Sequence, residues 1–293
     1  MSRSRVRNRL KILALFVVFV TLGATIGYVL VGVIGLFVVF LICVVLFALS
    51  LWMSDKQALK ILDAREITDP DFRLNRLILK VARGASTHAP KAYLIQSKAP
   101  NSLALGRNPD DCAIVVTEGL LESLTNAELE GVIGHELAHI LSSDTLLGAV
   151  TAGLANTLGL YGILRKRNPI VQKGASPVSD RKNVLMTLIR YTFNPLAGAI
   201  TQFAVSRNRE YQADRIGAGY TGAYAPLANA LRKIQRSTSR LEMDSFPALS
   251  HLVIYGEFSG WFNRWLFYSH PPVEERVQRL ERLSKFGGFS NLT

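Results

Sequence analysis

Two histidines and a glutamate near the middle of the chain have the types and spacing that metal-dependent hydrolysis requires. They lie in the pentapeptide His135-Glu136-Leu137-Ala138-His139. On a helix, residues i and i+4 share one face, so both imidazoles can bind one metal ion. Zn²⁺ accepts neutral imidazole at about 2.0–2.1 Å, and a catalytic site keeps one position open for water. A carboxylate beside that water can take its proton. The pentapeptide thus matches the H-E-x-x-H pattern of zinc proteases, with Glu136 as the base.

The residues before the pentapeptide predict the helix that carries it. Thr125 and Glu128 have the spacing of a capping box, which marks a helix start. An apolar face then recurs at helical spacing, formed by Leu129, Val132, Ile133, Leu137, Ile140 and Leu141. The histidines lie off this face, so the helix can bury one side and present both on another. Gly131 and Gly134 lower helix propensity and would let another backbone or a substrate approach. The alternative, two histidines inside an ordinary core helix, gives Glu136 no reason to be there.

A third ligand must come from elsewhere in the chain. A metzincin would need Gly at 142 and His at 145, where this chain has Ser142 and Thr145. Glu210 is the best carboxylate, and it shares a helix face with Asp214 at i,i+4. Glu210 could complete a His₂Glu site, and Asp214 could accept a hydrogen bond from a ligand histidine. Such a pair also occurs on ordinary solvated helix faces, so the spacing alone leaves both readings open.

Three separated motifs resemble the HtpX family of membrane-bound zinc endopeptidases, relatives of the CAAX prenyl endopeptidases and the Oma quality-control protease. They are H-E-L-A-H, S-R-N-R-E-Y-Q-A-D at 206–214 and S-H-P-P-V-E-E-R at 269–276. Their order and the intervening lengths also match. The resemblance implies that His135, His139 and Glu210 bind one Zn²⁺ per subunit and that Glu136 is the general base. It also implies an endopeptidase that acts on damaged or misfolded membrane proteins.

The resemblance bears on three further residues. His270 is either a helix cap or a contact to substrate or oxyanion, and the resemblance favours the contact. Arg207, one turn before Glu210, could hold a carboxylate or substrate, or be an ordinary interfacial arginine. The family has an Asn-Ala-Phe-Ala-type segment at the strand beside the substrate. Here the segment from Asn101 reads N-S-L-A-L-G, which keeps the backbone role but can change side-chain preferences.

An N-terminal apolar run predicts membrane attachment. No charged residue occurs between Ile12 and Leu51. Forty helical residues are about 60 Å long, twice a hydrocarbon core of about 30 Å, so we expect two spans joined between Gly27 and Gly35. A cleaved signal peptide would stop after one short run.

Charge then predicts orientation. The chain has a formal net charge of +12, and five basic residues precede the first span. By the positive-inside rule the N-terminus is cytoplasmic, and two crossings return the chain to the cytoplasm. We therefore expect a multi-pass protein of the cell membrane with its active site facing the cytoplasm. Nucleic-acid binding would need a basic stripe with aromatic residues in a folded domain, and none is evident. Cys43 and Cys112 are not expected to pair.

The expected fold is α+β and mostly helical. It comprises a transmembrane hairpin over residues 1–54, a zincin-like metalloprotease domain with a small sheet over 55–285, and a tail over 286–293. We expect a helix near 72–82, strands near 92–96, 103–105 and 113–116, and a last helix over 273–283. Apolar segments 145–164 and 184–205 interrupt the domain. If both crossed the membrane, the basic loop between them would lie outside, against the positive-inside rule. Membrane embedding and burial in a core both remain open.

The sequence thus predicts a membrane-bound zinc endopeptidase whose partners are protein or peptide substrates and the lipid bilayer. One alternative is a membrane scaffold with a structural or silent zinc site, which would need four protein ligands and no Glu136. Another is a processing protease with one defined substrate, as in the prenyl relatives, whose larger membrane chamber would need a longer chain. The oligomeric state does not follow from the sequence.

Overall fold

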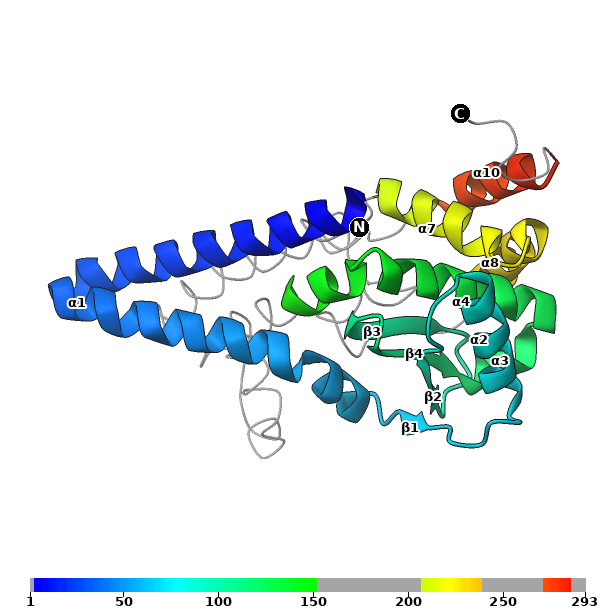
Figure 1. Ribbon diagram of the computed structural model, residues 1–293, viewed down its shortest axis with the longest axis horizontal. Helices are drawn as coiled ribbons and strands as arrows, with labels where there is room; N and C mark the ends of the chain where they lie inside the picture. The colour runs from blue at the N-terminus through cyan, green and yellow to red at the C-terminus, as the bar shows by residue number, and fades with distance from the viewer. Residues whose placement is uncertain (1–2, 152–206, 239–270, 286–293) are drawn as a thin grey trace, which may run out of the picture.

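The protein is described by a computed structural model that covers residues 3–151, 207–238 and 271–285 (Figure 1). Its first element is helix α1 (Arg3–Ile61), which reverses direction at Gly32, where φ is 70° and ψ is −150°. Only glycine adopts such a backbone without strain. The two arms touch near the turn, because a Cβ on Gly27 would lie 2.3 Å from the Gly35 carbonyl oxygen. The chain therefore reverses direction within the expected range, between Gly27 and Gly35.

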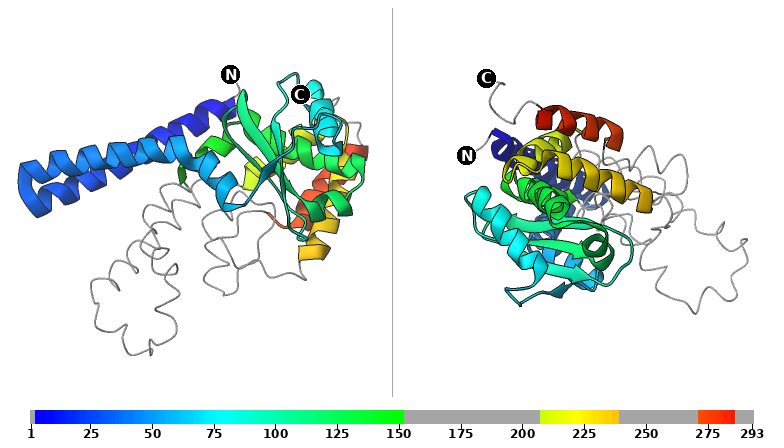
Figure 2. Two further views of the ribbon diagram at one scale, coloured as in Figure 1. Left: turned by 90° about the horizontal axis from the view of Figure 1, so that it is seen from below. Right: turned by 90° about the vertical axis from the view of Figure 1, so that its right-hand side faces the viewer.

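The hairpin presents apolar side chains to its surroundings. Residues Ser4–Leu49 are long and apolar enough to cross a membrane, and few of them are buried. Val29 and Leu30 near the turn are 75% and 74% exposed. Exposed apolar surface of this extent marks a membrane or partner contact. Figure 2 shows the hairpin extending well away from the rest of the described chain.

A four-stranded mixed sheet lies beside the base of the hairpin. Its strands are β1 (Arg65–Glu66), β2 (Lys91–Ile95), β3 (Ser102–Asn108) and β4 (Asp111–Thr117), in the order β1-β2-β4-β3. β2 and β4 are parallel, and the other neighbouring pairs are antiparallel. β3 comes last in the strand order and is therefore an edge strand. Successive side chains alternate between the two faces. Ala104 packs into the main core, whereas Leu103 and Leu105 pack against Ala58 near the end of α1. Three strands were expected, and β1 was not.

Helix α4 (Asn126–Leu141) lies between the sheet and a second helical layer (Figure 1). Its capping box is formed as expected, since Thr125 and Glu128 bond to each other's backbone N–H. Helix α2 (Arg73–Gly84) and the short α3 (Glu118–Ser123) pack on the sheet side. The second layer comprises α7 (Arg207–Gly219), α8 (Tyr224–Thr238) and α10 (Val273–Lys285).

Helix α4 is buried on nearly all sides. The close approach expected at Gly131 and Gly134 is made by α7 and α8, which cover the side of α4 that carries the histidines. A Cβ on Gly134 would lie 2.3 Å from the Gly217 carbonyl oxygen, and one on Gly131 would lie 2.8 Å from Leu227 Cβ. The two glycines of α4 therefore admit neighbouring helices. This close crossing brings Glu210 of α7 to the histidines.

The fold is α+β, mostly helical, with a small sheet and an apolar N-terminal helix, as the sequence predicts. Cys43 and Cys112 are free thiols, also as expected. The chain is helical again over 144–151, at the start of the expected segment 145–164. The remainder of that segment, segment 184–205, the tail after 285 and His270 lie outside the described residues.

Candidate metal centre

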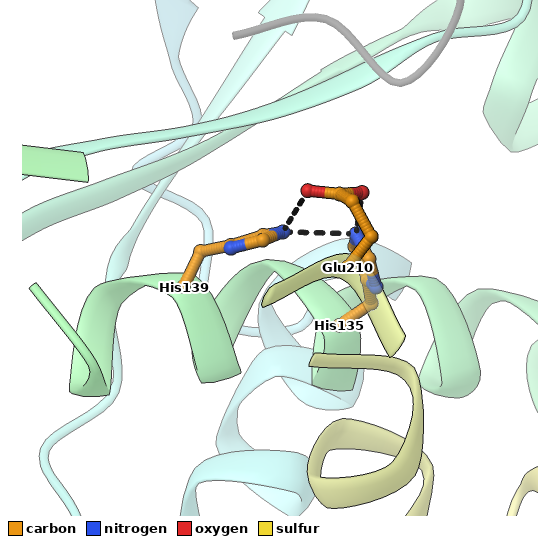
Figure 3. A group of neighbouring side chains, drawn as sticks. All are labelled: His135, His139 and Glu210. Atoms are coloured by element: carbon orange, nitrogen blue, oxygen red, sulfur yellow. Dashed lines mark hydrogen bonds and ion pairs between the residues drawn. The ribbon is translucent and has the colours of Figure 1, made fainter. Parts of the chain in front are cut away.

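His135, His139 and Glu210 come together at the crossing of α4 and α7 (Figure 3). One nitrogen or oxygen atom from each lies within 4.8 Å of the others. The two Nε2 atoms are 3.1 Å apart, and Glu210 oxygens lie 3.7 Å from His135 Nε2 and 3.5 Å from His139 Nε2. Two ligand atoms on one tetrahedral zinc ion are about 3.3 Å apart, given bonds of about 2.0–2.1 Å. The spacing and the donor set therefore fit a divalent metal ion.

His135 is oriented from behind by a buried carboxylate. Its Nδ1 lies 2.9 Å from Asp214 Oδ1, so Nδ1–H donates there and Nε2 faces the cluster. Arg276 of α10, which is fully buried, donates to both Asp214 oxygens at 2.6 and 2.8 Å. Burial alone would raise the pKa of Asp214, but the charge and hydrogen bonds of Arg276 and the bond from His135 outweigh it and lower the pKa to about 2. Asp214 thus has the contact that the spacing suggested.

His139 has a carboxylate of its own. Its Nδ1 lies 3.0 Å from Asp144 Oδ2. Asp144 also accepts from Ser142 Oγ at 2.8 Å and from Arg209 at 2.8 Å. Burial would lower the pKa of His139, but the charge of Glu210 and the bond and charge of Asp144 outweigh it and raise the pKa to about 9. Burial would likewise raise the pKa of Asp144, but the bond and charge of His139 and the charge of Arg209 lower it to about 2.

Glu136 lies close enough to the candidate ligands for its charge to help raise the pKa of His139. It is buried, and its Oε1 accepts a hydrogen bond from Ser102 Oγ at 2.7 Å. Ser102 is the first residue of edge strand β3, so this strand begins at the candidate base. Asn101 is also buried, and its Oδ1 accepts from the Ser102 N–H at 2.9 Å. Asn101 therefore shapes the backbone at the point where Ser102 meets Glu136.

Sequence reasoning missed three of the contacts that support the histidines. Arg276 was quoted only as the end of a motif, and Asp144 and Arg209 were not singled out. An aspartate between two helices is common as the N-cap of the second helix. That ordinary explanation for Asp144 gave no reason to expect a contact with His139. Arg207, the arginine that was singled out, is exposed at the start of α7. The arginine of that turn that contacts the histidine network is Arg209.

Comparison with known proteins agrees with this arrangement. Residues 69–284, which include all three candidate ligands, match peptidase family M48. Similar relatives are each named protease HtpX homolog. The relative from Syntrophobacter fumaroxidans is 33% identical over 284 residues, 96% of this chain and 99% of the relative. The relative from Pelotomaculum thermopropionicum is 36% identical over 279 residues, 92% and 96% of the two chains. The relative from Desulfatibacillum aliphaticivorans is 37% identical over 237 residues, 79% and 75%.

The likeness extends over both parts of the described chain, the apolar hairpin and the domain that holds the histidines and Glu210. M48 peptidases depend on a metal ion, and the cluster supplies a place for one. This chain therefore belongs to peptidase family M48, and within it to the HtpX family of membrane proteases.

Proposed function

We propose that this protein is a zinc-dependent endopeptidase of the cell membrane that cleaves extended segments of damaged or misfolded membrane proteins. The observation that carries the proposal is the His135–His139–Glu210 cluster with Glu136 beside it. Two imidazoles and one carboxylate are the protein ligands of catalytic zinc sites that leave a position open for water. When bound, the metal ion would acidify a water molecule and polarise the scissile carbonyl.

The remaining chemistry falls to the protein's own residues. Glu136 accepts the proton of the attacking water and returns it to the nitrogen of the leaving amine. Ser102 holds one Glu136 oxygen at 2.7 Å, which leaves the other oxygen for that proton. A scaffold with a structural metal ion would have no use for a carboxylate held in this way. Among the described residues, three side chains make up the candidate ligand set, fewer than the four of a structural zinc site.

Strand β3 is the proposed site of substrate pairing. It occupies one edge of the sheet, and its first residue contacts Glu136. An extended polypeptide can add to a sheet edge through main-chain hydrogen bonds, which demand little of its sequence. A quality-control protease needs such tolerance, because unfolded substrates share no motif. The segment from Asn101 to Gly106 therefore suits substrates that are recognised by being extended.

The hairpin supports a membrane location. We infer that both arms cross the bilayer and that both ends lie in the cytoplasm, because basic residues flank the apolar run on each side. The sheet follows α1 directly, so the candidate metal centre would lie near the bilayer surface. Loops and unfolded ends of membrane proteins would reach it there.

Metal removal and return test this function. The full chain is purified in detergent, treated with a chelator and supplied with casein as an unfolded substrate. We expect no cleavage until Zn²⁺ is added back at about one ion per chain, and Mg²⁺ should not replace it because it disfavours histidine ligands. Cleavage that continues in the chelator-treated protein would exclude a metal-dependent mechanism.

A further inference from the structure

The first turns of α1 lie against the end of α4 (Figure 1). Asn8 is completely buried there, and its Nδ2 donates to the Ser142 carbonyl oxygen at 3.0 Å and to Asp144 Oδ1 at 2.7 Å. One turn earlier, Arg5 Nε donates to the Leu141 carbonyl oxygen at 2.5 Å. The last carbonyls of a helix lack partners within it and attract positive charge. The N-terminal segment therefore contacts α4 where that helix needs donors.

These contacts continue to a candidate metal ligand through Asp144. Its Oδ2 is 3.0 Å from His139 Nδ1, and its Oδ1 accepts from both Asn8 and Arg209. Donors from α1, α7 and the end of α4 thus fix the plane of one carboxylate. That plane sets the direction of the His139 ring, and so the direction in which Nε2 points.

Burial of Asn8 argues that its amide has a specific task. A buried amide costs free energy unless it makes hydrogen bonds, and an apolar residue would pack at this place without that cost. A basic N-terminus that served only to orient the protein in the membrane would not need a buried asparagine. The neighbouring Arg7 and Arg9 are exposed, as that simpler role requires.

We propose that Asn8 is a positioning residue of the metal centre, which acts on His139 through Asp144. The start of the N-terminal hairpin is then part of the metal site and more than an anchor. This inference rests on the proposed function of the cluster as a zinc site. It predicts that a change within α1, outside the M48 match at residues 69–284, alters metal binding.

The test compares four variants of the full chain in detergent: Asn8→Leu, Asn8→Asp, Asp144→Asn and Arg9→Gln. Zn²⁺ affinity is measured by competition with a chromophoric chelator, and the Co²⁺-loaded protein gives a visible spectrum that reports ligand geometry. Residues that orient a ligand typically contribute about 10–100-fold in metal affinity, so we expect Asp144→Asn in that range. Asn8 lies one contact further from the metal site, so Asn8→Leu should lower the Zn²⁺ affinity by about 3–10-fold and shift the Co²⁺ absorption bands. Asn8→Asp should lower the Zn²⁺ affinity further, because it places a second carboxylate against Asp144.

Arg9→Gln is the matched control, since it lies in the same turn but is exposed. It should keep wild-type affinity and spectrum. Thermal unfolding of the metal-free variants separates positioning from stability. If Asn8→Leu unfolds earlier but binds Zn²⁺ and Co²⁺ as the wild type does, Asn8 only stabilises the fold and the proposal is wrong. If the wild type itself binds no Zn²⁺, the proposed function fails and this inference with it. If the wild type binds Zn²⁺ and only Asn8→Leu behaves normally, the inference alone fails.

Discussion

At the scale of residues, the two candidate ligand histidines are supported in the same way. Each donates Nδ1–H to a buried aspartate, and each aspartate pairs with an arginine: Asp214 with Arg276 and Asp144 with Arg209. A carboxylate behind a ligand histidine fixes the ring and makes Nε2 a better ligand. The arginine keeps the carboxylate ionised in a buried place. Four charged residues, two aspartates and two arginines, therefore orient the histidines without being candidate ligands themselves.

Metal binding should depend steeply on pH. The carboxylates around His139 raise its pKa to about 9 in the metal-free protein, so it carries a proton at pH 7. That proton must leave before Nε2 can bind zinc, which lowers the apparent affinity at low pH. We expect the affinity to rise about tenfold per pH unit between pH 6 and 8, as one released proton requires. Chelator competition measures it. A plateau above pH 7, as for a histidine of ordinary pKa, would contradict this assignment.

Substitution should separate a ligand from its support. Glu210→Ala removes a candidate ligand, so both zinc binding and cleavage should fall severely. Asp214→Ala removes only the group that orients His135, and we expect an affinity loss of about 10–100-fold. Zinc titration of the two purified variants checks this order. Full zinc occupancy of Glu210→Ala at low free metal would place the third ligand elsewhere, with His270 the next candidate.

At the scale of elements, the site depends on how closely two helices cross. Gly134 of α4 and Gly217 of α7 meet backbone to backbone, and this contact lies one residue from His135. Glu210 lies two turns before Gly217 on α7, so the separation of the helices sets its distance from the imidazoles. A protein interior is too densely packed to absorb an added methyl group here without movement.

Gly134→Ala should therefore damage the metal site without touching a candidate ligand. Its Cβ would lie 2.3 Å from the Gly217 carbonyl oxygen, so the helices must separate. Overpacking of this kind costs about 1–3 kcal/mol, and zinc affinity should fall as Glu210 moves away. Thermal unfolding and zinc titration give the two effects. Ala127→Ser, which adds one atom at an exposed position of α4, is the control and should change neither.

Local sequence signals predicted the elements but not their crossing. The capping box, the apolar spacing and the alternation of strands predicted α4, α2 and three strands, because each signal lies within one element. The glycines of α4 predicted a close approach, yet nothing local showed that α7 makes it. Asp144 and Arg276 escaped for the same reason. Arg276 contacts Asp214, which lies 62 residues away in the sequence, and Asp144 contacts Arg209, which lies 65 residues away.

At the scale of the whole molecule, the apolar hairpin and the protease domain form one structure. The second arm leads through Ala58 into the core beneath β3, and the first arm begins at the end of α4. Phe47 of the second arm and Val150 beyond α4 share a further apolar cluster. A domain held to its anchor at both ends cannot turn freely, so the candidate metal centre would keep a fixed height above the bilayer.

Topology gives a direct check on that arrangement. Basic residues precede the apolar run, and Lys56, Lys60 and Arg65 follow it, so both ends should face the cytoplasm. A reporter fused after residue 60 should therefore behave as cytoplasmic. A fusion after Gly32, at the turn of the hairpin, should behave as external and serves as the comparison. A residue-60 fusion on the outside would reverse the orientation and remove the proposed route of substrate to the site.

The base Glu136 allows the most direct test of the central claim that the cluster is a catalytic zinc site. Glu136→Gln keeps the shape of the side chain and leaves all three candidate ligands in place. We expect the purified variant to hold about one Zn²⁺ per chain with wild-type affinity, yet to cleave casein slower by several orders of magnitude, because no group accepts the proton of water. Zinc content and cleavage are measured on the same sample. Wild-type cleavage by that zinc-loaded variant would contradict the account.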